Sequence, residues 1–185
     1  MSAKKSLDRL FKSSLKRIIF AGLMILILGI VLSCQKKEEA ALLKIGLPEE
    51  PKSLNLWLAS DGNSRKILSQ IYQPLYTRDP KTLKIIPWLA QKDPVFNKED
   101  LSYTIKLRVA KWSDGTDFTS GDVVFTRKLL LDFKIPGYAS KWNVIKKLDA
   151  IDEHTLIFYL KEPSAIFLSR VLTTPIVSKK EWEQI

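Results

Sequence analysis

Alternation of apolar and polar residues predicts several short strands in this chain. The clearest alternation covers residues 103–109, where the odd-numbered positions are apolar and the even-numbered ones polar. Weaker patterns predict a short strand at 43–47, a short edge strand or a turn at 83–90, and a hairpin built from 144–151 and 155–160. The strand at 103–109 should therefore have one buried face and one face in water.

Helices are expected where apolar residues recur every three or four positions. The first begins at Asp61 and ends before Pro74. The second begins at Thr119, with Asp122 placed to reach back to the helix start as in a capping box. A third is expected at 163–172. The apolar faces are expected at Ile67, Leu68, Ile71 and Tyr72 in the first helix and at Phe125, Leu129 and Phe133 in the second.

Composition places the chain among globular proteins and narrows its chemistry. It has 185 residues, of which 45% are hydrophobic and 10% aromatic, with one cysteine and one histidine. A single cysteine excludes an intrachain disulfide, and two potential Cys/His ligands argue against a zinc site. The one histidine, His154, lies in a polar turn, and no phosphate-binding glycine loop is present. The sequence therefore predicts neither an enzyme, nor a cofactor, nor a bound metal.

The net charge of +10 at first indicates a nucleic-acid partner, but its distribution does not. Residues 1–17 hold six cations and one acid, so half of the excess lies in the first tenth of the chain. The remaining cations alternate with acids and form no basic stripe. We therefore expect no nucleic-acid binding.

An uncharged run at 18–35 follows this basic segment directly. Its fifteen apolar or small residues, 18–32, are fewer than the ~20 that span a membrane, and they match the hydrophobic region of a signal peptide. Polar residues come next, so the part of the chain after the run should lie outside the cytoplasm. An uncleaved N-terminal anchor remains the alternative.

Cys34 closes the run in the context Val31-Leu32-Ser33-Cys34. This context resembles the lipobox of bacterial lipoproteins, in which the signal is cut before a cysteine that becomes lipid-modified. The resemblance implies palmitate or similar acyl chains on Cys34 and anchoring to a bacterial membrane. The expected organisation is a signal peptide at 1–33, the lipidated cysteine with a polar tether at 34–41, and an incomplete, N-terminal part of a folded domain at 42–185.

The segment 111–126, KWSDGTDFTSGDVVFT, carries the most specific motif in the chain. Physically it is a strand end, a tight turn at Asp114-Gly115 and a capped helix, with Trp112 over the junction. It closely resembles the signature of extracellular solute-binding family 5, the oligopeptide- and dipeptide-binding lipoproteins of ABC importers. We call the residues that carry this match the signature residues: Trp112, Asp114, Gly115, Asp122, Val123 and Phe125.

Further resemblance covers nearly all of residues 42–185, for example at 43–57, 71–92 and 150–171. It implies an α/β (α+β) fold like that of type II periplasmic binding proteins, in which two lobes close on a ligand. Family members are well over twice as long as this chain. The expected content is therefore only the first part of lobe one with its small subdomain, an N-terminal fragment with impaired binding.

By this resemblance the chain is a substrate-binding lipoprotein that captures oligopeptides in the periplasmic space or at the cell surface and passes them to ABC permease subunits. The loop after the first expected strand is the candidate ligand-facing segment, although an ordinary acidic surface loop is an equal alternative. Its candidate residues are Glu49, Glu50, Ser53, Leu54 and Asn55. Two alternatives remain open: a small anchored lipoprotein with a structural or interaction role, and a family member that binds a metal, haem or sugar.

Overall fold

The computed structural model describes residues 42–184, of which 42–46 and 47–184 belong to two separate units. Predictions that concern residues 1–41, including Cys34, lie outside the described residues. In residues 42–184, no helix has the length and apolar character needed to cross a membrane.

The strand predicted at 43–47 is wrong. Residues 42–46 form neither helix nor strand, and Leu43 and Ile45 are 81% and 67% exposed. A strand is held by hydrogen bonds to a neighbouring strand, and no other described residue provides that pairing. Alternation alone therefore did not suffice to form a strand here.

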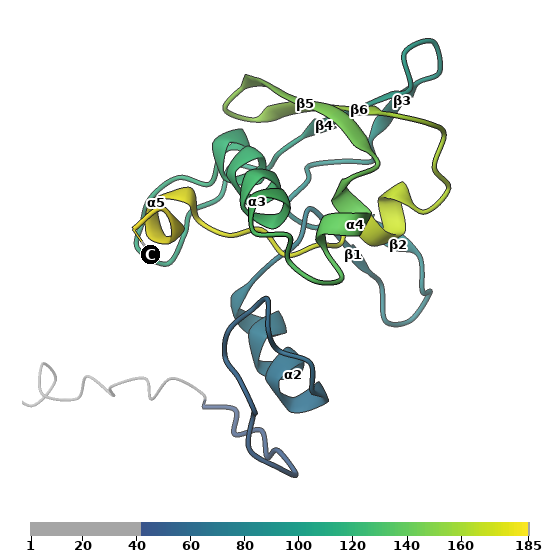
Figure 1. The fold of residues 1–185 in the computed structure, drawn as a ribbon. Helices are drawn as coiled ribbons and strands as arrows, with labels where there is room; N and C mark the ends of the chain where they lie inside the picture. The colour runs from purple at the N-terminus through teal and green to yellow at the C-terminus, as the bar shows by residue number, and fades with distance from the viewer. Residues whose placement is uncertain (1–41, 185) are drawn as a thin grey trace, which may run out of the picture. The chain divides into compact units, whose positions relative to one another are not determined.

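The unit at 47–185 contains a four-stranded antiparallel sheet in the order β3-β4-β6-β5 (Figure 1). Its strands are β3 (Val95–Asn97), β4 (Ser102–Lys106), β5 (Ile145–Asp152) and β6 (Thr155–Leu160). The predicted hairpin of 144–151 and 155–160 is confirmed as β5 and β6, which pair with two register shifts.

β4 forms the core of the strand predicted at 103–109, but it ends three residues early. Lys106 pairs with Thr155, the first residue of β6, so the chain beyond it has no β6 residue to pair with. Leu107 is still buried, and its N–H donates to the carbonyl of His154. Val109 is 82% exposed, so its predicted place on the buried face is wrong.

A separate two-stranded antiparallel sheet is formed by β1 (Tyr76–Arg78) and β2 (Ile85–Pro87). It confirms the short edge strand predicted at 83–90. Pro87 lies at the end of β2, where its missing N–H costs no central ladder bond. The Tyr76 N–H instead donates to the carbonyl of Leu172, which ties this hairpin to the C-terminal part of the unit.

Helix α2 (Gly62–Ile71) confirms the first predicted helix. Asp61 is its N-cap and accepts a hydrogen bond from the Ser64 N–H. Leu68 is buried as predicted, whereas Ile71 is 60% exposed. The apolar face expected from the spacing is thus only partly covered by the described residues.

Helix α3 (Ser120–Asp132) starts where predicted, and of the expected apolar face it buries Leu129, half-buries Phe125 and leaves Phe133 exposed. Asp122 reaches back to the Thr119 N–H at 2.8 Å. The residues buried along α3 include Val123, Thr126 and Leu130, while Phe133 is 74% exposed. Phe133 is therefore wrongly placed by the apolar spacing, and the buried side also carries Asp122 and Thr126, which bond to Lys179 and Val177.

Three short elements complete the unit: α4 (Ala139–Trp142), the π-helical turn η1 (Phe167–Val171) and α5 (Lys179–Trp182). The helix predicted at 163–172 is therefore reduced to the single turn η1. α3 contacts β5, α4 and α5, and α4 contacts η1. The core includes a cluster of three aromatic side chains, with Phe158 centred 6.4 Å from Trp142 and 5.5 Å from Phe167.

Candidate functional site

The turn at Asp114-Gly115 forms as the sequence predicts. The Gly115 N–H donates to the Trp112 carbonyl at 2.9 Å, and the Trp112 N–H donates to the Thr116 carbonyl at 2.8 Å. Gly115 has φ +84°, a conformation that glycine adopts without strain. Asp114 accepts from the N–H and hydroxyl of Thr116, so its side chain stabilises the turn locally.

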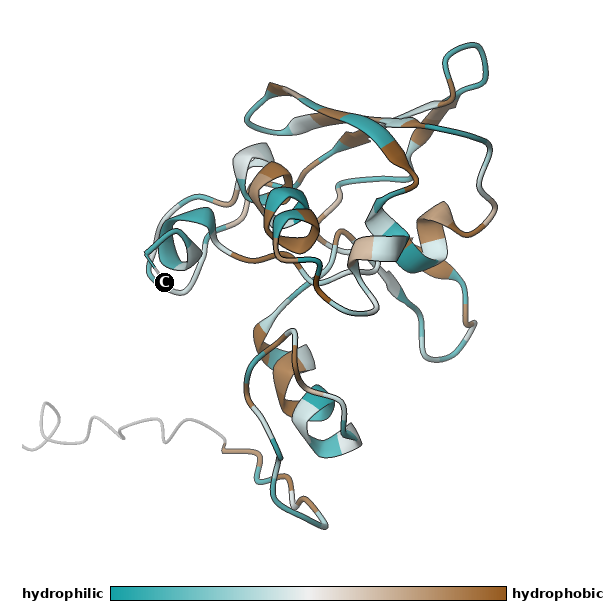
Figure 2. Ribbon diagram, viewed as in Figure 1, coloured by the Kyte–Doolittle hydropathy of each residue, from teal (hydrophilic) through white to brown (hydrophobic). Residues whose placement is uncertain are grey.

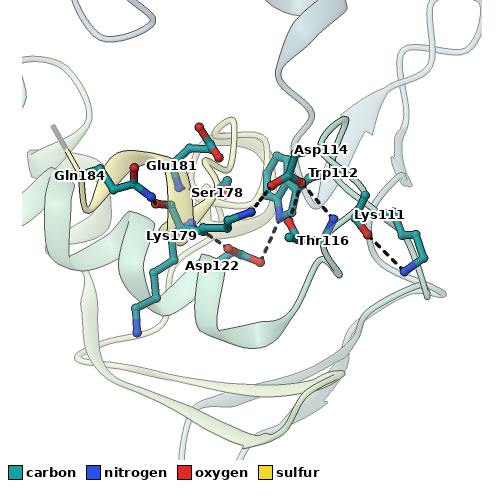
Figure 3. A network of polar contacts seen from close by, with 11 residues as sticks. Lys111, Trp112, Asp114, Thr116, Asp122, Ser178, Lys179, Glu181 and Gln184 are labelled. Carbon is teal, nitrogen blue, oxygen red and sulfur yellow. Dashed lines mark hydrogen bonds and ion pairs between the residues drawn. The ribbon is translucent and has the colours of Figure 1, made fainter.

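Asp122 is the centre of a polar network that joins three segments of the chain (Figure 3). Its Oδ2 accepts from the Thr119 N–H at 2.8 Å and from the Trp112 indole Nε1 at 3.3 Å. Its Oδ1 accepts from the backbone N–H of Lys179 at 2.8 Å. The carboxylate is 6% exposed, and both oxygens have protein donors.

Thr126 adds a second connection to the same C-terminal segment. Its hydroxyl donates to the Asp122 carbonyl at 2.8 Å and accepts from the Val177 N–H at 3.1 Å. Sequence reasoning placed Thr126 in the signature motif but found neither this role nor the contacts of residues 177–180. In the sequence, the one local indication of these contacts is the threonine one turn after Asp122.

Asp114 also forms an ion pair with Lys180 across 2.8 Å. The hydrogen bond from Lys180, followed by those from Thr116, holds the pKa of Asp114 well below its ordinary value. The same bond raises the pKa of Lys180. The Lys180 side chain is 55% exposed and that of Asp114 is 27% exposed, so solvent screening keeps the energetic contribution small.

We expect this ion pair to make stability depend on acid pH. A depressed folded-state pKa contributes stability above the unfolded value, near 3.8, and the contribution is lost as the pH falls through the folded value. Wild type should melt higher than Asp114→Asn at pH 7, and the difference in melting temperature should shrink below pH 4. A difference that stays constant from pH 7 to pH 2 would contradict this assignment.

A hollow of about 440 Å³ borders the network, with lining residues that include Asp117, Lys180 and Glu183. Its lining mixes both signs of charge, and the two oxygens of Asp122 are already engaged. Among residues 42–184, no group of three His, Cys, Asp or Glu side chains is placed to hold a metal ion. The signature residues have their contacts within the fold: Val123 is fully buried, Phe125 is half-buried, and Trp112 and Asp122 bond to each other.

The candidate ligand-facing loop is fixed at its base by the start of α2. The Ser53 N–H donates to the Ser64 hydroxyl at 3.2 Å, and the Asn63 amide donates to the Glu49 carbonyl at 3.1 Å. The Oδ1 atom of Asn55 accepts hydrogen bonds from the backbone N–H groups of Trp57 and Leu58. These residues thus lie in one ordered loop before α2.

Four of the five candidates in this loop are exposed and Ser53 is half-buried. Ser53 and Asn55 use their side-chain oxygens within the loop. In the described part of the chain, the carboxylates of Glu49 and Glu50 have no hydrogen-bond or ion-pair partner. The loop therefore presents two unpaired acids on a fixed backbone.

Comparison with known proteins identifies the family. Residues 84–184 match the model of bacterial extracellular solute-binding proteins, family 5 middle region. A protein of Brucella ovis named as an ABC transporter peptide-binding protein is 37% identical over 98 residues, which cover 52% of this chain and 18% of that protein.

Two solved structures share the fold. AgaA of A. tumefaciens R10, in complex with agropinic acid, is 27% identical with a TM-score of 0.66, over 73% of this chain and 28% of that one. DppA of Helicobacter pylori, in complex with the peptide STSA, is 25% identical with a TM-score of 0.60, over 73% of this chain and 30% of that one.

The match spans less than a third of each of these proteins, all of which are named as binding proteins. The α/β (α+β) fold of type II periplasmic binding proteins expected from the signature is confirmed. The chain belongs to extracellular solute-binding protein family 5.

Proposed function

We propose that this chain supplies part of the solute-binding component of an ABC importer, acts outside the cytoplasm, and captures oligopeptides. The observation that carries the proposal is the family match over 84–184, which includes every signature residue. The names of the Brucella and Helicobacter relatives support peptides as the solute class.

The loop at 49–55 is the proposed ligand-facing element. Its backbone is held by Ser64 and Asn63, so little ordering entropy would be lost on binding. The unpaired carboxylates of Glu49 and Glu50 suit an ammonium group, such as a peptide N-terminus or a lysine side chain. Leu54, which is 59% exposed, can contact an apolar side chain next to it.

Residues 42–184 alone should bind peptide weakly. They correspond to less than a third of the relatives, so a ligand on their surface stays in water on its other side. Binding energy in solute-binding proteins depends on enclosing the ligand and pairing its polar ends.

The test is a chimera in which the full chain is joined after Ile185 to the part of DppA that follows its matched region. By calorimetry, the chimera should bind the peptide STSA at least tenfold more tightly than the 185-residue chain does. Glu49→Gln together with Glu50→Gln should weaken binding about tenfold, which corresponds to the loss of one charge-assisted contact. Glu99→Gln changes an exposed acid outside the loop and is the matched control. It should leave the affinity for STSA unchanged.

A second candidate is a family member that binds a solute other than a peptide. It is favoured by the likeness to AgaA, whose TM-score exceeds that of DppA and whose structure contains agropinic acid. The test uses a second chimera, made with the corresponding part of AgaA. This candidate is favoured if that chimera binds agropinic acid, if the Glu49 and Glu50 changes weaken this binding, and if the DppA chimera does not bind STSA.

Lipid anchoring through Cys34 is part of the proposal. It is supported by the apolar run at 18–32 and by the residues Val31-Leu32-Ser33 before the cysteine. Cleavage before Cys34 would remove 1–33 and leave 34–41 as the tether to the membrane.

We expect Cys34→Ser to abolish metabolic labelling with palmitate and to leave residues 1–33 attached, both measurable by mass spectrometry of the purified chain. Ser33→Ala keeps a small residue before the cysteine and should be labelled like wild type. An unlabelled wild-type chain that retains residues 1–33 would instead support the uncleaved anchor.

A further inference from the structure

We propose that Trp57 is the positioning residue of the ligand-facing loop, because its indole ring ties residues 49–55 to the helix α5, which lies far away in the sequence. The inference rests on the proposed function of that loop, since it concerns how the loop is held for a ligand. It assigns no ligand contact to Trp57 itself.

The ring of Trp57 is buried, whereas other large side chains of the same segment are exposed. Trp57 is 7% exposed, but Leu54 and Leu58 are 59% and 67% exposed. The ring is centred 5.1 Å from that of Tyr138 and 6.0 Å from that of Trp182, and both pairs have the edge-to-face arrangement that aromatic rings favour. Trp57 thus leaves a surface loop to pack against the residue before α4 and against α5.

Hydrogen bonds connect Trp57 to the candidate ligand-facing residues. Its backbone N–H donates to the Oδ1 atom of Asn55 at 3.0 Å, and the Asn55 N–H donates to the Ser53 hydroxyl at 3.1 Å. The Ala59 N–H donates to the Asn55 carbonyl at 3.0 Å, which closes a turn around Trp57. A shift of Trp57 therefore moves Asn55 and Ser53 with it.

The helix α5 offers one side chain for this contact. Three of its residues, Lys179, Lys180 and Glu181, are charged and exposed, whereas Trp182 is half-buried. Figure 2 shows this helix largely in the teal of hydrophilic residues. The Lys179 N–H donates to the Oδ1 atom of Asp122, so α5 is itself fixed to α3. Trp182 is therefore the residue through which the network around Asp122 reaches the loop.

The ring of Trp57, and not its indole N–H, makes the connection. Among residues 42–184, the buried Nε1 atom of Trp57 has no hydrogen-bond acceptor. A buried donor without an acceptor costs free energy, so it does not explain why the loop is held. Phenylalanine keeps an aromatic ring without this donor. Trp57→Phe should therefore hold the loop, whereas Trp57→Ala should release it.

Spin labelling of the 185-residue chain tests the inference without a ligand. In a Cys34→Ala background, a nitroxide on Leu54→Cys reports the motion of the loop, and one on Ile151→Cys, which is 57% exposed on β5 in wild type, is the control site. Trp57→Ala and, separately, Trp182→Ala should shorten the rotational correlation time at Leu54→Cys about threefold, because nanosecond loop motion is released. Trp57→Phe should leave it unchanged, and no variant should affect the label at Ile151→Cys.

Trp88→Ala is the matched control, because it removes a tryptophan that is 45% exposed and belongs to neither ring contact of Trp57. It should leave the loop label unchanged. A Trp57→Ala chain that melts at a lower temperature but keeps the label as slow as in wild type overturns the inference, because a side chain that only fills the core would give that result. If circular dichroism shows that Trp57→Ala does not fold, the label in Trp182→Ala decides by the same criterion.

A double substitution tests whether both tryptophans act through one contact. Trp57→Ala combined with Trp182→Ala should release the loop label no further than Trp57→Ala alone, since the contact is already lost. Fully additive release would show that Trp182 acts on the loop by another route, and would overturn the connection through Trp57.

The DppA chimera relates the position of the loop to binding. In it, Trp57→Ala should weaken STSA binding about tenfold, because the released loop must be ordered again when the ligand binds. Trp57→Phe should bind as tightly as the unsubstituted chimera. STSA binding that Trp57→Ala does not weaken overturns the positioning role. A loop label released by Trp57→Ala, together with no STSA binding by the unsubstituted chimera, removes the peptide function and leaves the connection between loop and α5 in place.

Discussion

Replacing Asp122 with alanine should lower the free energy of unfolding by about 3 kcal/mol, because three donors lose their acceptor together. These donors are the Trp112 indole N–H and the backbone N–H groups of Thr119 and Lys179. The carboxylate is 6% exposed, so water can replace it only in part. Urea unfolding of the full chain, followed by tryptophan fluorescence, measures the change.

Asp117→Ala is the matched control for this prediction. Asp117 belongs to the same segment, but its side chain is 65% exposed and pairs with Lys111 at the surface. Exposed ion pairs contribute about 0–1 kcal/mol. Losses of similar size in Asp117→Ala and Asp122→Ala would show that the network around Asp122 does not stabilise the fold.

Trp142→Ala should lower the free energy of unfolding by about 4 kcal/mol, as expected when a large aromatic side chain is removed from a packed core. Trp142 is fully buried, and its Nε1 donates to the Thr174 hydroxyl at 3.0 Å. The substitution therefore leaves a cavity next to Phe158 and also removes the hydrogen bond of Thr174. The same urea titration measures the loss.

Phe133→Ala is the control for the core substitution. It also shortens an aromatic residue to alanine, but Phe133 is 74% exposed at the end of α3. Its effect should stay within about 0.5 kcal/mol. A loss comparable to that of Trp142→Ala would mean that Phe133 packs in the core after all, as its spacing in the sequence had predicted.

Local patterns in the sequence predicted the elements whose contacts are themselves local. The β5–β6 hairpin, the turn at Asp114-Gly115 and the start of α3 each close within a few residues, so alternation, turn chemistry and capping suffice. The strand expected at 43–47 depended instead on a distant partner. Sequence alternation cannot tell whether that partner is present.

The rotation of α3 shows a second limit. Apolar spacing favoured the face with Phe125, Leu129 and Phe133. Leu129 is buried, but the buried side also includes the polar residues Ser120, Asp122 and Thr126. Their acceptors and donors come from Asp152, Lys179 and Val177. A periodicity that scores only apolar residues counts these buried polar positions as exposed, so it predicts the buried side of α3 only in part.

Distance along the chain also limited the prediction of the candidate site. The signature residues could be predicted because the motif is contiguous, and the structure explains their spacing by the hydrogen bonds of Asp114 and Asp122. The contributions of Lys179 and Lys180 could not be predicted, since those residues lie more than fifty positions away and carry no motif of their own.

The long span of the Asp122 network also sets an order of events during synthesis. The bonds from Thr119 and Trp112 can form once residues 112–122 have left the ribosome. Those from Val177 and Lys179 join residues 51 and 57 positions apart, so they form only after the C-terminal segment has emerged. Until Lys179 has emerged, the Oδ1 atom of Asp122 therefore lacks the donor that it has in the folded chain, and α3 is not yet joined to the C-terminal segment at this point.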